Sequence, residues 1–415
     1  MDISLLVGSS KGKFLANSDP LRLLMITHSV YVRDTRVRRY VEPLAEEGHL
    51  VDIICLASED GGSQSNHPNI TVHTLPITRS RREGWGHVIG WANAALMMFL
   101  YTSKLDIRNR YDLIHVHNMP DFLVFCALIP RLRGCPIILN IHDPTPELAQ
   151  SKLQVSESHI LVRAEVLLEK ISIRFSSHII TATPTFENAL IRRGVPRQKI
   201  TVIMNAADPR FSRGNHDKWK ARRTRTDKFT LLYVGTVADR YGLQIAVRAL
   251  PVLRPAVPGI KLKIVPKIRD EGKALDDCLE LANTLGVRDL IEVDGPVPLE
   301  QMPDIMRDAD IGIYPALRDC HMDIALSLKI PEMASVGLCI VSTRLPVLEE
   351  LYGDESIAFV PPGDHMAFAA KILELYGSPD FRERLARKAM ERSAGLTWDS
   401  QYRVYRELLR GILGR

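Results

Sequence analysis

Two charged residues, Lys329 and Glu332, stand three positions apart in the segment LSLKIPEMASVGLCIVS at 326–342. Residues with this spacing share one face of a helix, so the ammonium and the carboxylate would point to the same side. A lysine near a helix start can neutralise a phosphate, and a glutamate one turn later can accept two hydrogen bonds from a ribose. The pair therefore indicates a nucleotide site, with an ordinary surface ion pair as the alternative.

A glycine-containing turn, GTVADRYG at 235–242, stands between an apolar run of strand length and a helix-like segment. Gly235 would let the backbone approach a phosphate, and the helix that follows would supply free N–H groups. Arg240 adds a guanidinium that can bind a diphosphate through two hydrogen bonds. Because every strand–helix unit needs such a turn, the signal is weak alone, and an exposed loop arginine is the alternative.

The N-terminal half places polar residues where three expected strands end. These residues are Asp34, Arg36, His117, His142 and Asp143. Since the carboxyl ends of parallel strands share one edge of a sheet, the side chains are expected to gather there and to form part of a site. His115, in the same run DLIHVH as His117, is expected to point the opposite way and to have a structural role.

Signatures of metal-dependent, hydrolase and P-loop sites are absent from the sequence. It contains no Asp-x-Asp at a strand end, no Gly-x-Ser-x-Gly and no Walker loop. We therefore expect positive side chains and helix dipoles to stabilise phosphate charge where other enzymes use Mg²⁺, with no metal and no cofactor.

Strand-length apolar runs alternate with helical segments in two consecutive series. The first series of expected strands is 22–27, 50–56, 70–75, 112–117, 136–142, 178–182 and 200–204. The second is 229–234, 261–265, 291–293, 311–314, 339–342 and 357–360. A polar, basic stretch at 212–228 separates the two and is interpreted as a linker. The pattern predicts an α/β protein with two doubly wound parallel sheets and a cleft between them.

Composition limits the classes of function. The 415 residues are 46% hydrophobic and 25% charged, which is typical of a globular protein with two domains. A net charge of +5 is compatible with phosphorylated ligands or an anionic membrane, and is far weaker than the basic face of a nucleic-acid-binding protein. The six cysteines form no Cys-x-x-Cys pair, which favours buried free thiols in a reducing compartment.

An uncharged stretch, Gly84–Ser103, has about the length of a membrane span. Its small and polar residues favour a buried or half-buried helix instead. Three arginines just upstream, Arg79, Arg81 and Arg82, leave open a contact with anionic lipid. The N-terminal segment is too short in its apolar part for a signal peptide.

The order of these motifs resembles the retaining glycosyltransferases of family 4, which have the GT-B fold. In the first half the resembling segments are DTRVRR, DLIHVHN, IHDPTPE and ITVIMNAADPRF. In the second half they are LLYVGTVADRYGL, IEVDGPVP, MRDADIGIYPA, LKIPEMASVGLCIVST and FVPPGD. The resemblance implies a Rossmann-like acceptor domain at 1–211, a nucleotide-sugar domain at 212–395, and a C-terminal helix, 396–415, that crosses back to the first domain.

The resemblance also implies roles for individual residues. Glu332 matches the second glutamate of the family's Glu-x7-Glu motif, which binds ribose hydroxyls, and Lys329 matches the lysine three positions before it. The first glutamate falls on Ile324, and Asp323 is the adjacent candidate to replace it. His117 matches a family histidine that faces the donor sugar.

Two positions depart from the family pattern at the diphosphate. The family's arginine after the turn glycine falls on Thr236, and its lysine before the next glycine falls on Tyr241. Arg240 and Lys267 are the candidates to compensate. Backbone groups expected to contact the nucleobase belong to Gly295, Pro296 and Val297. The catalytic residues so implied are His117, Arg240 and Lys329.

The expected function is metal-independent transfer of a sugar from a nucleotide diphosphate to a hydroxyl acceptor, with retention. The acceptor would be a glycan, a lipid-linked molecule or a small molecule, and no nucleic acid is expected as a partner. A cytoplasmic location is expected, with peripheral contact of the N-terminal domain at the inner membrane surface left open. Two alternatives remain: a sugar-nucleotide epimerase of the same architecture, or a binding scaffold with weak activity. The nucleobase, the sugar and the oligomeric state stay open.

Overall fold

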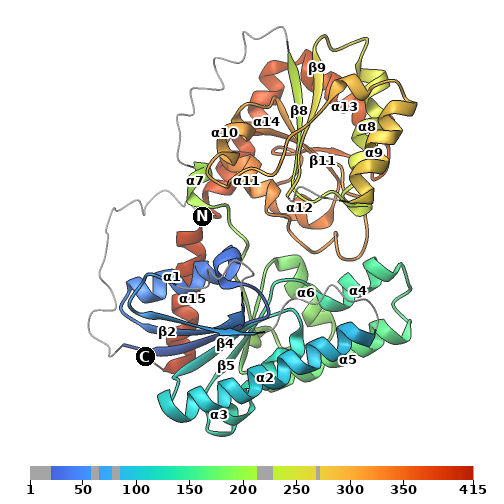
Figure 1. Ribbon diagram of the computed structural model, residues 1–415. Coiled ribbons are helices and arrows are strands. Elements are labelled where there is room, and N and C mark those ends of the chain that lie inside the picture. The colour runs from blue at the N-terminus through green and yellow to red at the C-terminus, as the bar shows by residue number, and fades with distance from the viewer. Residues whose placement is uncertain (1–19, 58–64, 77–84, 213–227, 268–271, 415) are drawn as a thin grey trace. The chain divides into compact units, whose positions relative to one another are not determined.

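The computed structural model describes residues 20–57, 65–76, 85–212, 228–267 and 272–414, and the chain forms two β-sheets with flanking helices (Figure 1). Every strand expected from the sequence is present, with ends that differ by at most two residues. The predicted α/β architecture is therefore confirmed. The expected linker at 212–228 falls almost wholly on 213–227, outside the described residues.

The first sheet has seven strands in the order β3-β2-β1-β4-β5-β6-β7. The strands are β1 (Arg22–Thr27), β2 (Leu50–Leu56), β3 (Ile70–Leu75), β4 (Leu113–His117), β5 (Ile137–Ile141), β6 (His178–Thr181) and β7 (Ile200–Val202). β1 pairs in parallel with both β2 and β4, and Thr27 lies opposite His117 at the carboxyl end. Because the strands run parallel, the segments that follow β1 and β4 leave from the same edge of the sheet.

Helices connect these strands along the chain. They are α1 (Thr35–Glu46), α2 (Trp85–Asn109), α3 (Leu128–Leu132), α4 (Thr145–Leu153), α5 (Ile160–Phe175), α6 (Pro184–Arg192) and α7 (Pro209–Ser212). A 3₁₀ segment, η2 (Asp121–Ala127), leads into α3. Helix α1 begins at Thr35 with Pro43 inside it. Helix α2 contains most of the uncharged stretch, and in the described part of the chain no helix is both long and apolar enough to cross a bilayer.

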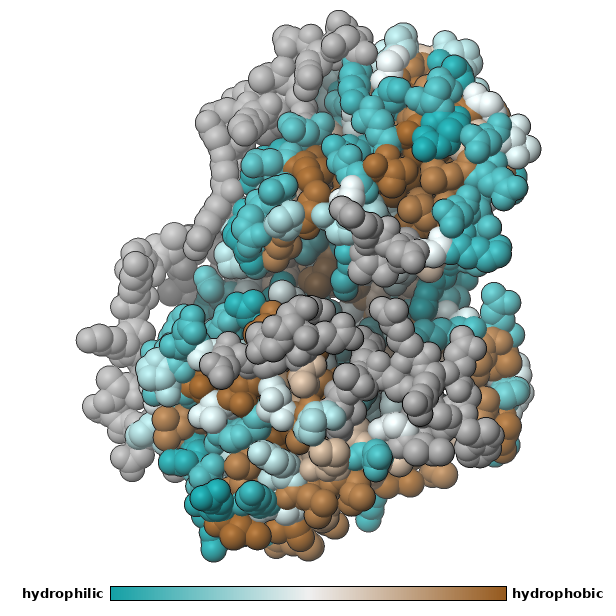
Figure 2. Space-filling model, viewed as in Figure 1, coloured by the Kyte–Doolittle hydropathy of each residue, from teal (hydrophilic) through white to brown (hydrophobic). Residues whose placement is uncertain are grey.

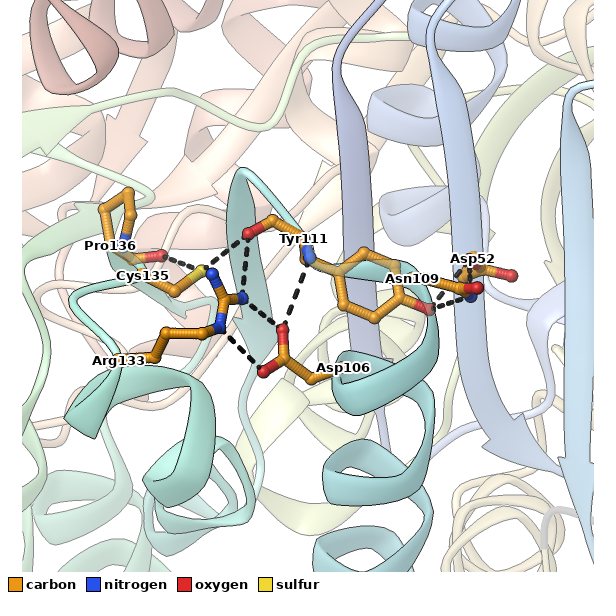
Figure 3. Close-up of polar contacts among 7 residues, drawn as sticks. All are labelled: Asp52, Asp106, Asn109, Tyr111, Arg133, Cys135 and Pro136. Carbon is orange, nitrogen blue, oxygen red and sulfur yellow. Dashed lines mark hydrogen bonds and ion pairs between the residues drawn. The ribbon is translucent and has the colours of Figure 1, made fainter.

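A network of polar contacts joins the C-terminal end of α2 to the first sheet (Figure 3). The Asp106 carboxylate of α2 pairs with the Arg133 guanidinium just after α3 and accepts a hydrogen bond from the Tyr111 backbone N–H at 3.3 Å. The Tyr111 hydroxyl donates to the Asp52 carboxylate of β2 at 2.7 Å. His73 of β3 contacts the other Asp52 oxygen at 2.8 Å. The network therefore fixes α2 and α3 to β2 and β3.

Replacing Asp52 with asparagine is expected to lower the stability at neutral pH by about 1–3 kcal/mol, because the hydroxyl and imidazole partners lose a charged acceptor. Burial opposes ionisation of Asp52, but hydrogen bonds from His73 and Tyr111 outweigh it and lower its pKa below the usual 3.8. A lowered pKa stabilises the fold above the unfolded pKa, and this stability is lost as the pH falls through the folded pKa. The free energies of unfolding of the wild-type protein and Asp52→Asn, measured with urea, should therefore converge as the pH falls below about 4.

Exposed Asp276 provides the control, since Asp276→Asn removes a carboxylate of α9 (Lys273–Thr284) that does not belong to this network. The control should match the wild-type protein at neutral pH. A constant difference between Asp52→Asn and wild type at every pH would contradict the prediction.

The second sheet has six strands in the order β10-β9-β8-β11-β12-β13. The strands are β8 (Phe229–Val234), β9 (Ile260–Val265), β10 (Ile291–Val293), β11 (Ile311–Tyr314), β12 (Cys339–Thr343) and β13 (Ala358–Val360), and each neighbouring pair is parallel. Alternate residues of β8 enter two different apolar clusters, Leu231 and Tyr233 in one, Leu232 and Val234 in the other. The sheet is therefore covered on both faces, as its continuous apolar strands predict.

The helices of this half lie on both sides of the sheet (Figure 1). They are α8 (Leu243–Leu253), α9 (Lys273–Thr284), α10 (Met302–Arg307), α11 (Lys329–Ser335), α12 (Pro346–Leu351), α13 (His365–Gly377) and α14 (Pro379–Ala394). The chain is not helical at 395–397, and a last helix, α15 (Trp398–Leu413), follows. The Gln401 side chain accepts a hydrogen bond from the Met204 N–H, so α15 begins beside the segment after β7.

Candidate functional site

The turn between β8 and α8 is built around two glycines with left-handed backbones. Gly235 has φ +95° directly after β8, and Gly242 has φ +68° directly before α8. Residues with a Cβ rarely adopt such angles, which explains glycine at both places. Between them lies a short 3₁₀ segment, η5 (Asp239–Tyr241), and the Tyr233 hydroxyl donates to the Thr236 carbonyl at 2.7 Å.

Gly242 is also required by the neighbouring loop. A Cβ at this position would lie 1.9 Å from the Pro315 carbonyl oxygen, which belongs to the loop after β11. The Leu317 N–H of that loop donates to the Arg240 carbonyl at 2.8 Å. The loops that follow two neighbouring strands are therefore held together by main-chain atoms.

Lys329 occupies the first position of α11 and is surrounded by aromatic rings. Its ammonium lies 4.7 Å from the ring centroid of Tyr233, 4.6 Å from that of Tyr241 and 5.6 Å from that of Tyr314. Each ring face attracts a cation, and the attraction is strongest away from water. A Cβ on Gly235 would lie 2.6 Å from Lys329 Cε, so this glycine leaves room for the lysine stem. We call Tyr233, Tyr241 and Tyr314 the tyrosine cradle.

Two of the cradle tyrosines, Tyr241 and Tyr314, remain neutral at physiological pH. Burial raises the pKa of Tyr241 above its ordinary value, and burial likewise raises the pKa of the fully enclosed Tyr314. Since desolvation penalises the phenolate, both rings face Lys329 as phenols and bind it through their π faces. The cradle therefore fixes the position of the ammonium without neutralising its charge.

Replacing Tyr241 with leucine is expected to lower kcat/KM for the reaction at this site by up to about tenfold, because one of three cation–π contacts is lost. Tyr241→Phe keeps the ring and should stay within about twofold of wild type. Steady-state kinetics of both variants, with Tm as a check of folding, would measure the effect. Equal losses in the two variants would assign Tyr241 a role through its hydroxyl group instead.

The other residues predicted for a nucleotide follow strands of the same sheet. Glu332 lies half-buried in the first turn of α11, and Lys267 is exposed two residues after β9. Gly295, Pro296 and Val297 follow the edge strand β10. Because β10, β9, β8 and β11 are neighbours and parallel, the segments after them leave from one edge of the sheet, as the sequence predicts.

Asp323 and Arg240, which are predicted to replace side chains that the family has and this chain lacks, differ in their surroundings. Asp323 accepts an ion pair from Arg318, whose Nε lies 3.0 Å from Oδ1. Ile324, at the position of the absent glutamate, is buried. Arg240 is half-buried and its guanidinium lies 5.7 Å from the Tyr241 ring centroid. Arg240 therefore stands next to the cradle, whereas Asp323 is already engaged by a neighbouring arginine.

In the first sheet, the structure gives the predicted residues different environments. Asp34 is the N-cap of α1, where its side chain accepts a hydrogen bond from Arg36 N–H and pairs with the Arg36 guanidinium at 3.3 Å. His142 is buried after β5, and Asp143 beside it is half-buried. The Asp34–Arg36 pair explains both residues locally, and their role toward an acceptor stays a prediction.

The prediction that His115 points away from His117 is wrong. The two rings are stacked, with centroids 4.2 Å apart and planes 19° from parallel, and Tyr40 of α1 lies against both. The reason is the strand period of two, which sends residues 115 and 117 of β4 to the same face. Burial, and then the charge of His117, lower the pKa of His115 well below 6.5, so its imidazole is neutral.

Tyr233, Tyr314 and His321 are not among the residues that the sequence predicts for the site. A signal was available for the tyrosines, because each stands in the last two positions of a strand that ends at the predicted site, β8 or β11. His321 is buried in the loop before α11, and burial lowers its pKa. No spacing pattern in the sequence marks this histidine.

Two family models match the chain in succession. Residues 34–206 match the glycosyl transferase 4-like domain, and residues 228–378 match the glycosyl transferases group 1. The first match contains the strands from β2 to β7, and the second contains the Gly235 turn, the tyrosine cradle and α11. Both halves of the fold are therefore recognised independently.

Known proteins resemble the chain over nearly its whole length. A D-inositol 3-phosphate glycosyltransferase of Paenarthrobacter aurescens (strain TC1) is 23% identical over 390 residues, which are 91% of this chain and 93% of that protein. A sucrose-phosphate synthase from Thermosynechococcus elongatus superposes with a TM-score of 0.76 at 17% identity, covering 94% of this chain and all of the other. Anabaena HepE, in complex with UDP, has a TM-score of 0.72 at 15% identity, with coverage of 94% and 100%. The chain therefore belongs to the GT4-type glycosyltransferases and has the GT-B fold.

Proposed function

We propose that this glycosyltransferase moves a sugar from a nucleoside diphosphate to a hydroxyl acceptor, with retention and without a metal ion. The observation that carries the proposal is the ammonium of Lys329, which the tyrosine cradle holds beside the Gly235 turn. A fixed positive charge at that place suits a diphosphate leaving group. The resemblance to HepE, which binds UDP, favours a uridine nucleotide on residues 212–395.

In the proposed reaction the bond between the anomeric carbon and the diphosphate oxygen breaks, and its electron pair leaves with the diphosphate. The acceptor oxygen forms the new bond on the same face of the sugar, and its proton passes to the departing phosphate. Lys329 and Arg240 stabilise the negative charge that develops on the diphosphate, in place of a metal ion. Retention rests on the family resemblance.

The remaining predicted residues bind and orient the substrates. In the donor, Glu332 accepts hydrogen bonds from the ribose, and the nucleobase contacts the backbone at 295–297. Further donor contacts are assigned to Gly235, Thr236, Lys267 and Asp323. On the acceptor side we assign Asp34, Arg36, His142 and Asp143, with His117 against the transferred sugar.

The donor class can be tested by ligand-induced stabilisation. UDP at about 100 times its Kd should stabilise the protein by about 2.7 kcal/mol and raise Tm by several degrees, because it binds only the folded chain. GDP, ADP and CDP provide the comparison, and Lys329→Ala should abolish most of the shift. A panel in which no nucleoside diphosphate raises Tm would reject the proposed donor site.

The reaction itself can be followed by donor consumption with and without an acceptor. Transfer predicts that the sugar appears on a glycan, a lipid-linked molecule or a small polyol only when that acceptor is present. The resemblance to an inositol 3-phosphate glycosyltransferase makes phosphorylated cyclitols a reasonable first acceptor class. Isomerised donor in the absence of acceptor would indicate an epimerase instead.

We also propose that the enzyme works in the cytoplasm. The support is the state of its cysteines, which are all free, and five of the six are buried. A chain with this usage of thiols is typical of a reducing compartment.

A further inference from the structure

We propose that α2 and α3 form a surface that docks on an anionic phospholipid bilayer. The surface is defined by apolar side chains that face solvent on these two helices. They are Leu96, Leu100, Tyr101, Ile107, Leu128, Ile129 and Leu132. Soluble proteins rarely gather so many large apolar side chains on two adjacent helices unless the surface binds a partner.

The spacing of the apolar residues gives α2 one continuous face. Leu96, Leu100 and Ile107 are four and seven residues apart, which places them in one stripe along the helix. Figure 2 shows hydrophobic side chains gathered along the lower edge of the view, where Figure 1 draws α2 and α3. An amphipathic helix that lies in a membrane interface has the same arrangement.

The ion pair between Asp106 and Arg133 joins the two helices into one surface. Ile107 follows Asp106 in the chain and Leu132 precedes Arg133, so each of these apolar positions is next in sequence to a member of the ion pair. They are also the most exposed residues of the set, 71% for Ile107 and 77% for Leu132. Figure 3 shows the two charged side chains pointing toward each other.

The charge around the apolar stripe selects the partner. Lys104, Arg108, Arg110 and Arg131 are exposed on or next to α2 and α3. The acidic residues between 90 and 134 are Asp106, Asp112 and Asp121, and none of them is exposed. By helical spacing, Lys104 and Arg108 lie along one side of the stripe that contains Leu100 and Ile107. The positive charges would therefore lie at the headgroups when the apolar side chains enter the acyl boundary. An anionic bilayer would bind both the apolar and the basic side chains of this surface. Neither group of side chains has a role in the proposed transfer reaction.

The surface differs from the one suggested by the sequence. The sequence places basic residues upstream of the helix, at Arg79, Arg81 and Arg82, and these lie outside the described residues. In the structure the exposed basic and apolar residues both lie on the C-terminal half of α2 and on α3. The docking surface therefore rests on Leu96–Arg110 and Leu128–Leu132.

Co-sedimentation of the full chain with vesicles tests the inference. The protein should bind vesicles of phosphatidylcholine mixed with phosphatidylglycerol, bind much less to pure phosphatidylcholine, and be released by salt. Ile107→Glu with Leu132→Glu should weaken partitioning at least about tenfold, because two apolar anchors become charged. Lys104→Glu with Arg108→Glu should weaken it by at least about fivefold for each basic residue.

Matched controls use similar residues of the second sheet's helices. Met366→Glu changes an exposed apolar residue of α13, and Arg387→Glu with Lys388→Glu changes exposed charges of α14. These variants should bind as the wild-type protein does, and all variants are compared by Tm. If Ile107→Glu with Leu132→Glu lowers Tm, the milder Ile107→Ser with Leu132→Ser replaces it.

Three results would overturn the proposal. The first is a wild-type protein that fails to bind anionic vesicles, and the second is full binding by folded variants of the surface. The third is a dimer in analytical ultracentrifugation that Leu132→Glu dissociates, which would assign the surface to a second copy of the chain. Because vesicle binding is measured without donor or acceptor, its failure is distinct from failure of the proposed reaction.

Discussion

Replacing Lys329 with alanine is expected to lower kcat for sugar transfer about 100-fold or more, because a fixed positive charge at the proposed site of the leaving diphosphate is lost. The structure places the Lys329 ammonium over three tyrosine rings, so it is already oriented before a nucleotide binds. No other side chain is expected to take that position, since a glycine, Gly235, leaves the space that the lysine stem fills. Steady-state kinetics with saturating donor measures the loss.

The neighbouring glutamate should respond differently. Glu332→Ala removes the proposed acceptor for the ribose, so it should raise KM for the donor about tenfold or more and affect kcat less. Lys388→Ala on α14 is the control, because this exposed lysine pairs with Glu391 at 2.9 Å and should keep wild-type kinetics when it is replaced. If Lys329→Ala and Glu332→Ala both retain full activity in folded protein, the donor lies elsewhere.

Replacing Gly242 with alanine is expected to destabilise the protein by about 3 kcal/mol or more, because left-handed strain and a clash act together. The added Cβ would stand 1.9 Å from the Pro315 oxygen, and a backbone atom cannot move aside as a flexible side chain can. The clash should also separate the loops that Leu317 N–H and Arg240 carbonyl connect. Urea unfolding would measure the stability.

A substitution at Gly286 tests the left-handed backbone strain without the steric clash. It has φ +67°, almost the same angle as the +68° of Gly242, but a Cβ there would meet nothing within 4 Å. Gly286→Ala should therefore cost only the left-handed strain, about 1 kcal/mol. Equal losses in the two variants would show that the contact with Pro315 relaxes without cost.

The sequence predicts the strands well because a strand that is buried on both faces is a continuous run of apolar residues. Runs such as FTLLYV at 229–234 and IGIY at 311–314 are apolar throughout, and the turns around them contain glycine or proline. Strand order is less accessible, because it depends on packing between segments far apart in the chain. The side on which His115 points was predictable from the strand period, and the error there came from assigning that period wrongly.

The sequence predicts those site residues that lie close together on a single helix. Lys329 and Glu332 were assigned from their spacing, and the structure places both in the first turn of α11. The tyrosine cradle was not assigned, because its three rings come from β8, η5 and β11, which meet only in the folded chain. The sequence predicts that Asp34 faces an acceptor, and the structure shows it as the N-cap of α1, where it accepts a hydrogen bond from the Arg36 N–H.

The main-chain bond between Leu317 and Arg240 has a consequence for how this turn can change over evolutionary time. Main-chain hydrogen bonds and the glycines at its two ends determine the backbone path of the turn. This path therefore does not depend on the side chains between the glycines. Thr236 and Tyr241 could then diverge from the residues typical of related enzymes while the loop keeps its path. A library randomised at these two positions should consequently yield many folded proteins, whose preferences among donors differ.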